Sequence, residues 1–290
     1  MVKLAHIVNL FQPAETSDLK LAQAVTIETM TRAKAEAKDV ANVELLSSQT
    51  LEDRFVVPSS FKATTDLSRS VADLQNFEKP MQLPVLKDIL DRLYDESEAD
   101  YLIFTNVDIG LQPDFYKQVV KFIEAGHDAF MINRRRIPAK FNSVNDLNQM
   151  YSEKGLKHPG FDCFVFHRNL YPKFSLAEVC TGVPFIEITL SQNLFCFAKN
   201  PKVFTDEFLT FHIGMEIFNK RAPKPYLDYN RTQFWKAMKK IWPELDSRKW
   251  SHGQALLPIR MIRWGLHPCF PIRLALKLEP RRWGFKGKSD

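Results

Sequence analysis

Asn106 and Asp108 are the residues whose types and spacing first suggest chemistry. They follow a mostly apolar run, 101–104, in the stretch ADYLIFTNVDIGLQPDFY. A buried carboxylate is costly unless it is paired or bound to a cation. Asp108 is therefore a candidate ligand for Mg²⁺ or Mn²⁺, and Asn106 points to the same side two residues earlier. The alternative interpretation of Asp108 is a capping residue in a turn between a strand and a helix.

Alternating strand and helix patterns surround these two residues. An amphipathic helix, 83–98, runs directly into the strand that ends before Asn106. Alternation of this kind predicts a parallel sheet, and such sheets bind ligands at the carboxyl ends of their strands, where Asn106 and Asp108 lie. Asp66 and Asp114 are expected to cap helices. The sequence predicts strands at 4–11, 42–49, 100–105 and 128–133 and helices at 19–38, 66–79, 83–98 and 114–127.

The pattern is less regular after residue 133. We expect a basic loop, RRRIPAK, at 134–140 and a strand at 162–167. Residues 183–200 are compatible with a helix or with a pair of strands, and a helix is expected within 231–245. The composition becomes basic near residue 219. We therefore predict a domain over 1–218 and a basic, aromatic-rich helical extension over 219–290.

The order of these elements resembles the GT-A family of nucleotide-sugar glycosyltransferases. In that family an amphipathic helix precedes a strand that ends in an Asp-x-Asp motif, which binds a metal and the donor diphosphate. Here the motif reads Asn106-Val107-Asp108, so an asparagine replaces the first carboxylate. The resemblance covers roughly residues 4–215. It implies an α/β, Rossmann-like fold with a mixed, mostly parallel sheet flanked by helices.

The resemblance also implies a carboxylate on the acceptor side and a late histidine in the metal site. Asp162 and Glu187 are the candidate catalytic carboxylates. We prefer Asp162, because it lies between a Pro-Gly turn and an apolar strand, where a residue can point into a cleft. His212 is the candidate histidine, on the lip of a loop, and shares the metal with Asp108. The structural alternatives are an ion pair or cap for each acid and a core position for the histidine.

Four side chains are assigned to the donor. By the family analogy, Arg134 and Arg69 supply the positive charge that compensates the diphosphate leaving group. Asn9, at the end of the first strand, is expected near the base and ribose. Asn106 is the fourth.

Composition narrows the class of protein further. Hydrophobic residues make up 45% of the 290 residues, which is enough for a sizeable core. Ten glycines against seventeen prolines disfavour glycine-rich phosphate loops. The four cysteines form no CxxC pair, which disfavours a structural zinc site and a disulfide framework. The cysteine usage therefore leads us to expect a reduced, cytoplasmic setting. The sequence also shows neither a signal-peptide pattern nor an apolar run of about 18 residues.

The C-terminal charge predicts an anionic partner. Residues 219–290 hold seventeen Lys and Arg against five Asp and Glu, a net charge of +12 in a chain of +6. Three interpretations stay open: a patch for an anionic membrane surface, a nucleic-acid-binding segment, or a segment that packs its apolar residues on the main domain. No RNA or DNA motif is recognisable, so we do not expect nucleic acid.

Together these features predict a glycosyltransferase that moves a sugar from a nucleotide-diphosphate donor to a hydroxyl acceptor. The acceptor would be a glycan or a lipid-linked molecule, and the cofactor would be Mn²⁺ or Mg²⁺. A position at the periphery of the membrane is left open by the basic C-terminal segment. Two alternatives remain. One is a non-catalytic nucleotide-binding or scaffold protein on the same fold, which the missing first aspartate favours. The other is a nucleotidyltransferase, which has a similar sheet.

Overall fold

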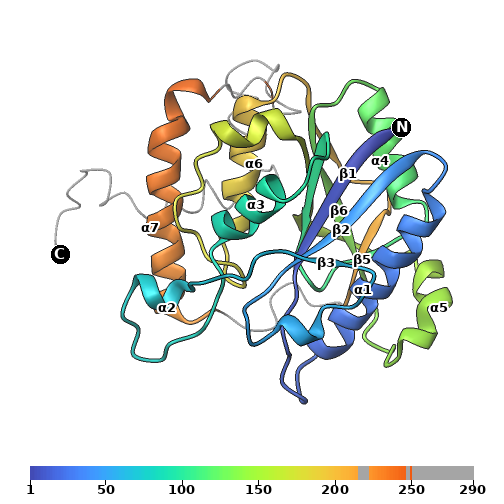
Figure 1. Ribbon diagram of the computed structural model, residues 1–290, viewed down its shortest axis with the longest axis horizontal. Helices are drawn as coiled ribbons and strands as arrows, with labels where there is room; N and C mark the ends of the chain where they lie inside the picture. Colours follow the sequence, from blue (N-terminus) through green and yellow to red (C-terminus); the bar gives the residue numbers. More distant parts are fainter. Residues whose placement is uncertain (215–221, 246–248, 250–290) are drawn as a thin grey trace.

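A mixed sheet with helices on both faces organises the part of the chain that the computed structural model describes, residues 1–214, 222–245 and 249 (Figure 1). The predicted α/β class is confirmed. The strands are β1 (Val2–Asn9), β2 (Ala41–Ser48), β3 (Lys62–Ala63), β4 (Tyr101–Thr105), β5 (Gly110–Leu111), β6 (Ala129–Ile137), β7 (Leu156–His167), β8 (Pro201–Phe204) and β9 (Thr210–Ile213).

The first half of the sheet is parallel. The strand order is β3-β2-β1-β4-β7-β6-β9-β5, with β8 also paired to β6. β1 lies between β2 and β4 and runs parallel to both. Most of β1 and β4 is buried, which explains their apolar runs, because a parallel strand is covered on both faces. Polar residues begin where these strands end, at Asn9 and Asn106.

β7 interrupts the parallel pattern. It lies between β4 and β6 and is antiparallel to both, with Thr105 opposite Cys163. The pairing of β6 with β7 shifts register on either side of Asn133, which marks a bulge. Because β7 is antiparallel, its middle rather than its end crosses the edge where β4 stops. A residue inside β7 can therefore face the strand-end site.

Helices cover the two faces of the sheet. They are α1 (Leu19–Glu36), α2 (Val71–Leu74), α3 (Leu86–Asp95), α4 (Phe115–Glu124), α5 (Leu147–Ser152), α6 (Ile186–Phe197) and α7 (Lys224–Ile241), with short 3-10 helices η1 (Arg54–Val56), η2 (Val144–Asp146), η3 (Arg168–Lys173) and η4 (Trp242–Glu244). In Figure 1, α3, α6 and α7 lie on one side of the sheet and α1, α4 and α5 on the other.

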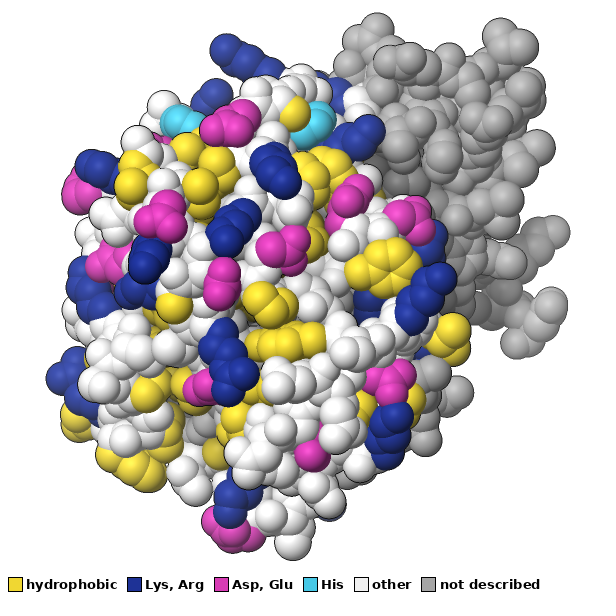
Figure 2. Space-filling view, turned by 90° about the vertical axis from the view of Figure 1, so that its right-hand side faces the viewer, with side chains coloured by type: hydrophobic (Ala, Val, Ile, Leu, Met, Phe, Trp, Pro, Cys, Tyr) yellow, Lys and Arg dark blue, Asp and Glu magenta, His cyan; other side chains and the backbone are white. Residues whose placement is uncertain are grey.

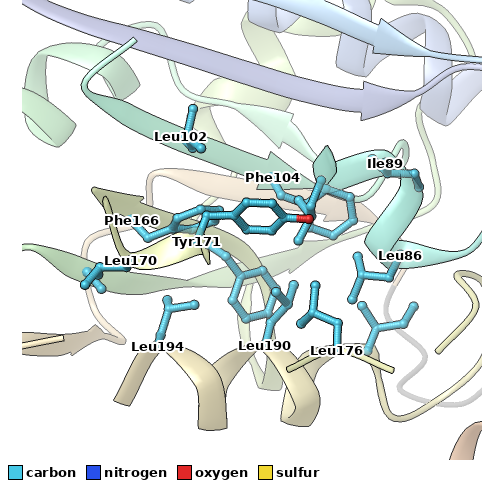
Figure 3. Close-up of a cluster of buried hydrophobic side chains, with 14 of the residues drawn as sticks. Leu86, Ile89, Leu102, Phe104, Phe166, Leu170, Tyr171, Leu176, Leu190 and Leu194 are labelled. Carbon is cyan, nitrogen blue, oxygen red and sulfur yellow. The ribbon is translucent and has the colours of Figure 1, made fainter. Parts of the chain in front are cut away.

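The larger hydrophobic cluster lies on the α3 and α6 side of the sheet. α3 contributes Leu86, Ile89 and Leu90, which are fully buried and form the apolar face that the sequence predicted. Leu102 and Phe104 of β4 join the same cluster, as Figure 3 shows. The burial of α3 against β4 therefore fixes the strand whose end carries Asn106 and Asp108.

α7 belongs to the same core. Its residues Phe234, Trp235 and Met238 are buried in the cluster that α3 and α6 form, while Lys236 and Lys239 are exposed. For this helix the interpretation of apolar packing with solvated cations is confirmed. The membrane-surface and nucleic-acid interpretations of residues 250–290 concern residues outside the described part of the chain. The domain boundary near residue 218 stays a prediction.

Two predicted helix caps take other partners. The helix expected over 66–79 is confined to α2, where Ser70 caps by accepting from the backbone N–H of Ala72. Asp66 instead accepts hydrogen bonds from Gln49 and Arg54. Asp114 precedes α4 but makes no side-chain cap. The prediction of one helix over 66–79 was therefore wrong, because local side-chain contacts provide hydrogen-bond partners for the backbone without a longer helix.

None of the helices in the described ranges is long and apolar enough to cross a membrane. On the face in Figure 2, which is the right-hand side of Figure 1, basic and acidic side chains are interspersed, and the hydrophobic side chains are scattered among them. That distribution is typical of a solvated surface.

Candidate functional site

The site forms where β4 ends. Val107 packs into the hydrophobic cluster on the α1 and α4 side, whereas Asn106 contacts Asp162 of β7 and Asp108 contacts His212 of β9. Both remain partly exposed. The end of a buried strand thus presents two polar side chains together, as the sequence predicted.

His212 lies directly against Asp108. The Nε2 atom of His212 is 3.1 Å from Oδ2 of Asp108, and about a quarter of each side chain is exposed (24% and 22%). Burial raises the pKa of Asp108, but the hydrogen bond and electrostatic interaction with His212 and the positive charge of Arg134 outweigh it, so the pKa lies below its usual value. Asp108 is therefore ionised at neutral pH. His212 lies within β9 rather than on a loop lip, because β9 pairs alongside β6.

Asp162 lies in the middle of β7 and is held from two sides. The Asn106 amide donates to Oδ1 of Asp162 at 2.8 Å, and Nη1 of Arg134 lies 2.7 Å from Oδ2. Only 2% of Asp162 is exposed. The expected access through a Pro-Gly turn was wrong, since the segment 158–162 continues the strand. The same is true of Arg134, which lies in β6 rather than in a basic loop.

Glu187 completes the group of acids. It lies in the first turn of α6, which follows Phe185 in a left-handed conformation (φ 95°). A Cβ atom placed on Gly160 of β7 would lie 3.3 Å from Oε2 of Glu187, so the helix start reaches the β7 bulge. Burial, followed by the negative charges of Asp162 and Asp108, raises the pKa of Glu187 to about 8, against the opposing effect of Arg134.

Two residues that the sequence analysis did not select organise the bulge. Asn133 donates through Nδ2 to the carbonyl oxygens of His158 and Gly160, at 2.5 and 2.8 Å. The Nδ1 atom of His158 accepts from the Gly160 N–H, and Nε2 lies 3.1 Å from Nη2 of Arg134. Burial and Arg134 lower the pKa of His158 to about 3, so the ring is neutral. Neither residue follows a strand end, which is the signal that identified Asp108.

Asn9 and Arg69 take structural partners. Asn9 lies at the end of β1 as predicted, and its amide donates to the carbonyl oxygen of Ser48 at 2.8 Å. Arg69 forms a two-pronged ion pair with Asp88 (2.7 and 2.9 Å) and contacts Glu178 at 3.1 Å. The structure thus gathers six of the eight predicted site residues at one place. They are Asn106, Asp108, Arg134, Asp162, Glu187 and His212.

The donor set at Asp108 and His212 suits a divalent cation in part. A carboxylate oxygen and an imidazole nitrogen 3.1 Å apart can both reach one ion. No group of three or more metal-binding side chains occurs among the residues that the structure describes. Mg²⁺ and Mn²⁺ are commonly held by one or two protein ligands together with water and substrate phosphates. The residues therefore fit an ion that a phosphorylated ligand helps to bind.

No family model and no curated protein matches the chain. Among solved structures it is similar to Staphylococcus aureus TarS 1–349 in complex with UDP-GlcNAc, with 11% identity and a TM-score of 0.47 over 84% of this chain and 66% of that one. A longer TarS structure matches with 11% identity and a TM-score of 0.45, over 82% of this chain and 43% of that chain.

A third similar structure is Mycobacterium tuberculosis glucosyl-3-phosphoglycerate synthase in complex with Mn²⁺, UDP and glucosyl-3-phosphoglycerate. Its identity is 14% and its TM-score 0.45, over 84% of this chain and 80% of that one. This chain thus spans less than two thirds of both TarS structures. At these identities and TM-scores we transfer no function from these proteins, and the proposal below depends on this chain's own residues.

Proposed function

We propose that the protein is a glycosyltransferase that takes a sugar from a nucleotide-diphosphate donor. The observation that carries the proposal is the contact of Asp108 with His212 at the end of β4, beside the ion pair of Asp162 with Arg134. Both pairs lie at the edge of the sheet where strand β4 ends, and parallel sheets bind ligands at such edges. They were also the residues that the sequence resemblance selected.

Asp108 and His212 would hold the divalent cation in this proposal. When bound, the ion neutralises the diphosphate as it leaves. Arg134 adds a fixed positive charge at the same edge, although Asp162 already shares it. Asn9 and Arg69 retain a proposed role at the donor only if the nucleotide reaches them, since their present contacts are structural.

Glu187 would accept the proton of the acceptor hydroxyl. A general base acts best when its pKa lies near the working pH. The pKa of Glu187 is raised to about 8, so the ionised minority of Glu187 at neutral pH would be the form that accepts the proton. Asp162 suits this role less well, because it is 2% exposed and both of its oxygens face donors. The proposal therefore gives proton transfer to Glu187 and a holding role to Asp162.

Calorimetry with UDP, GDP, ADP and TDP and their glucose and N-acetylglucosamine derivatives, with and without Mn²⁺, tests the proposal. We expect one nucleotide series to bind, more tightly with Mn²⁺, and its sugar to be released slowly by hydrolysis. Absence of binding across the panel would contradict the proposal and favour a scaffold. Release of pyrophosphate from a nucleoside triphosphate would instead favour a nucleotidyltransferase.

A further inference from the structure

Asn106 is paired with a carboxylate from the neighbouring strand. Its Nδ2 donates to Oδ1 of Asp162 at 2.8 Å, between residues 56 positions apart in the chain. The antiparallel register makes this contact, because Thr105 lies opposite Cys163 and the next residues face each other across the pair. Burial raises the pKa of Asp162, and the charge of Arg134 opposes that rise. In the ionised form that pairs with Arg134, the carboxylate only accepts, so the amide of Asn106 is the donor.

Few charged groups surround the contact of Asn106 with Asp162. Asp162 is buried, and Arg134 is the cation in ion-pair contact with it. The imidazole ring of His158 also lies beside Arg134, and it is neutral because its pKa is lowered to about 3. An aspartate at position 106 would put two carboxylates about 2.8 Å apart against one guanidinium, where they repel each other or one of them must hold a proton.

We propose that positions 106 and 162 share a single negative charge, and that Asp162 acts as a positioning residue that holds the end of β4, and with it Asp108, through Asn106. The asparagine at the strand end is then a consequence of the aspartate on β7. It keeps the edge from acquiring a further negative charge that would repel a nucleoside diphosphate. The statement about the ligand rests on the proposed function, whereas the coupling of the two residues does not.

An exchange of the two residues tests the proposal. In the double variant N106D/D162N, the amide at position 162 donates to the carboxylate at 106 while its carbonyl accepts from Arg134, so the same contacts run in the opposite direction. N106D alone places two acids together, and D162N alone leaves Arg134 without its countercharge. Because the three variants keep the shape of the side chains, differences among them report charge and hydrogen bonding.

Thermal unfolding in EDTA is the first measurement. We expect each single variant to lower Tm by about 5 °C or more, and the exchange to recover at least half of the larger loss, because contacting residues are coupled. The control is N42D/D39N, which makes the same chemical changes at two exposed residues around the start of β2. It should leave Tm almost unchanged. Additive losses in the exchange, or its failure to fold alongside both single variants, would overturn the proposal.

Affinity for the nucleoside diphosphate that binds best with Mn²⁺ is the second measurement. We expect N106D to weaken it at least about tenfold and the exchange to return it to within about threefold of the wild type. Recovery of Tm without recovery of affinity would show a merely structural pair and overturn the positioning role. If no diphosphate binds the wild type, the proposed function fails, while the Tm measurements still decide the coupling.

Discussion

Individual residues of the site differ in how strongly their protonation depends on the fold. Asp108 has a lowered pKa because His212 lies against it, whereas Glu187 has a pKa raised to about 8 by burial and neighbouring acids. Two carboxylates in one site thus favour opposite protonation states at neutral pH. Such separation is typical of sites where one acid binds a cation and another transfers a proton.

The raised pKa of Glu187 predicts a pH-dependent stability. Above its unfolded pKa of about 4.5 and below about 8, the folded state holds a proton that the unfolded state has lost, so this residue makes stability fall as pH rises. E187Q removes that contribution. We compare the free energies of unfolding of E187Q and the wild type, both without metal. We expect the difference, variant minus wild type, to increase by about 2 kcal/mol as the pH rises from 5.5 to 7.5.

Urea unfolding at several pH values measures this difference. E124Q, at an exposed residue at the end of α4, is the matched control and should show no such trend. A difference between E187Q and the wild type that does not change with pH would show that Glu187 titrates normally.

The strand and helix elements explain which site residues the sequence could reveal. The apolar run of β4 and the amphipathic pattern of α3 are local signals, so the strand end at Asn106 and Asp108 was predictable. The antiparallel placement of β7 is not local. It sets the contact of Asp162 with Asn106 and the bulge at Asn133, which depend on pairing between distant strands. The sequence named Asp162 and Arg134, but it placed Asp162 where a Pro-Gly turn meets a strand and Arg134 in a basic loop, whereas both lie within strands.

The sequence analysis also missed a set of hydrogen bonds between α7 and the segment before α6, which we call the Asn230 clasp. Asn230 is fully buried, and it accepts from the N–H of Cys180 and donates to the carbonyl oxygens of Cys180 and Pro184 at 2.9 and 3.1 Å. These contacts hold the turn that leads into Phe185 and the start of α6. The helix in the basic extension therefore positions the element that carries Glu187.

The Asn230 clasp predicts that N230A lowers the free energy of unfolding substantially. We expect a loss of about 2–4 kcal/mol in free energy of unfolding, because several buried backbone groups lose their partner at once. Denaturant unfolding measures the loss, with N148A on an exposed face of α5 as the control. A cost below about 1 kcal/mol would mean that water replaces the amide without penalty.

At the scale of the whole described part of the chain, α7 packs into the main hydrophobic core. Phe234 is fully buried in the cluster that contains residues of α3, β4 and α6. The strand that ends at the candidate site and helix α7 thus share one hydrophobic core, so we expect removal of α7 to disturb the site.

Truncation tests this organisation. A chain that ends at residue 221 loses α7, and we expect it to be unfolded or aggregated by circular dichroism and gel filtration. In the full chain, F234A should cost about 3–5 kcal/mol, whereas K236A on the exposed side of the same helix should cost almost nothing. A soluble, cooperatively folded 1–221 fragment with an unchanged Tm would contradict the shared core and support the predicted boundary near 218.

The proposed function depends most on the contact of Asp108 with His212. The most direct measurement is therefore the Mn²⁺-dependent binding of UDP, GDP, ADP and TDP to the wild type, D108N, H212A and a control variant. The wild type should bind one of them at least about tenfold more tightly with Mn²⁺ than with EDTA, a difference of about 1.4 kcal/mol. D108N and H212A should each lose that difference while keeping a cooperative unfolding transition, and D114N, at an exposed residue before α4, should retain it. Metal-dependent binding that survives in both D108N and H212A, or wild-type binding that Mn²⁺ does not change, would contradict the account.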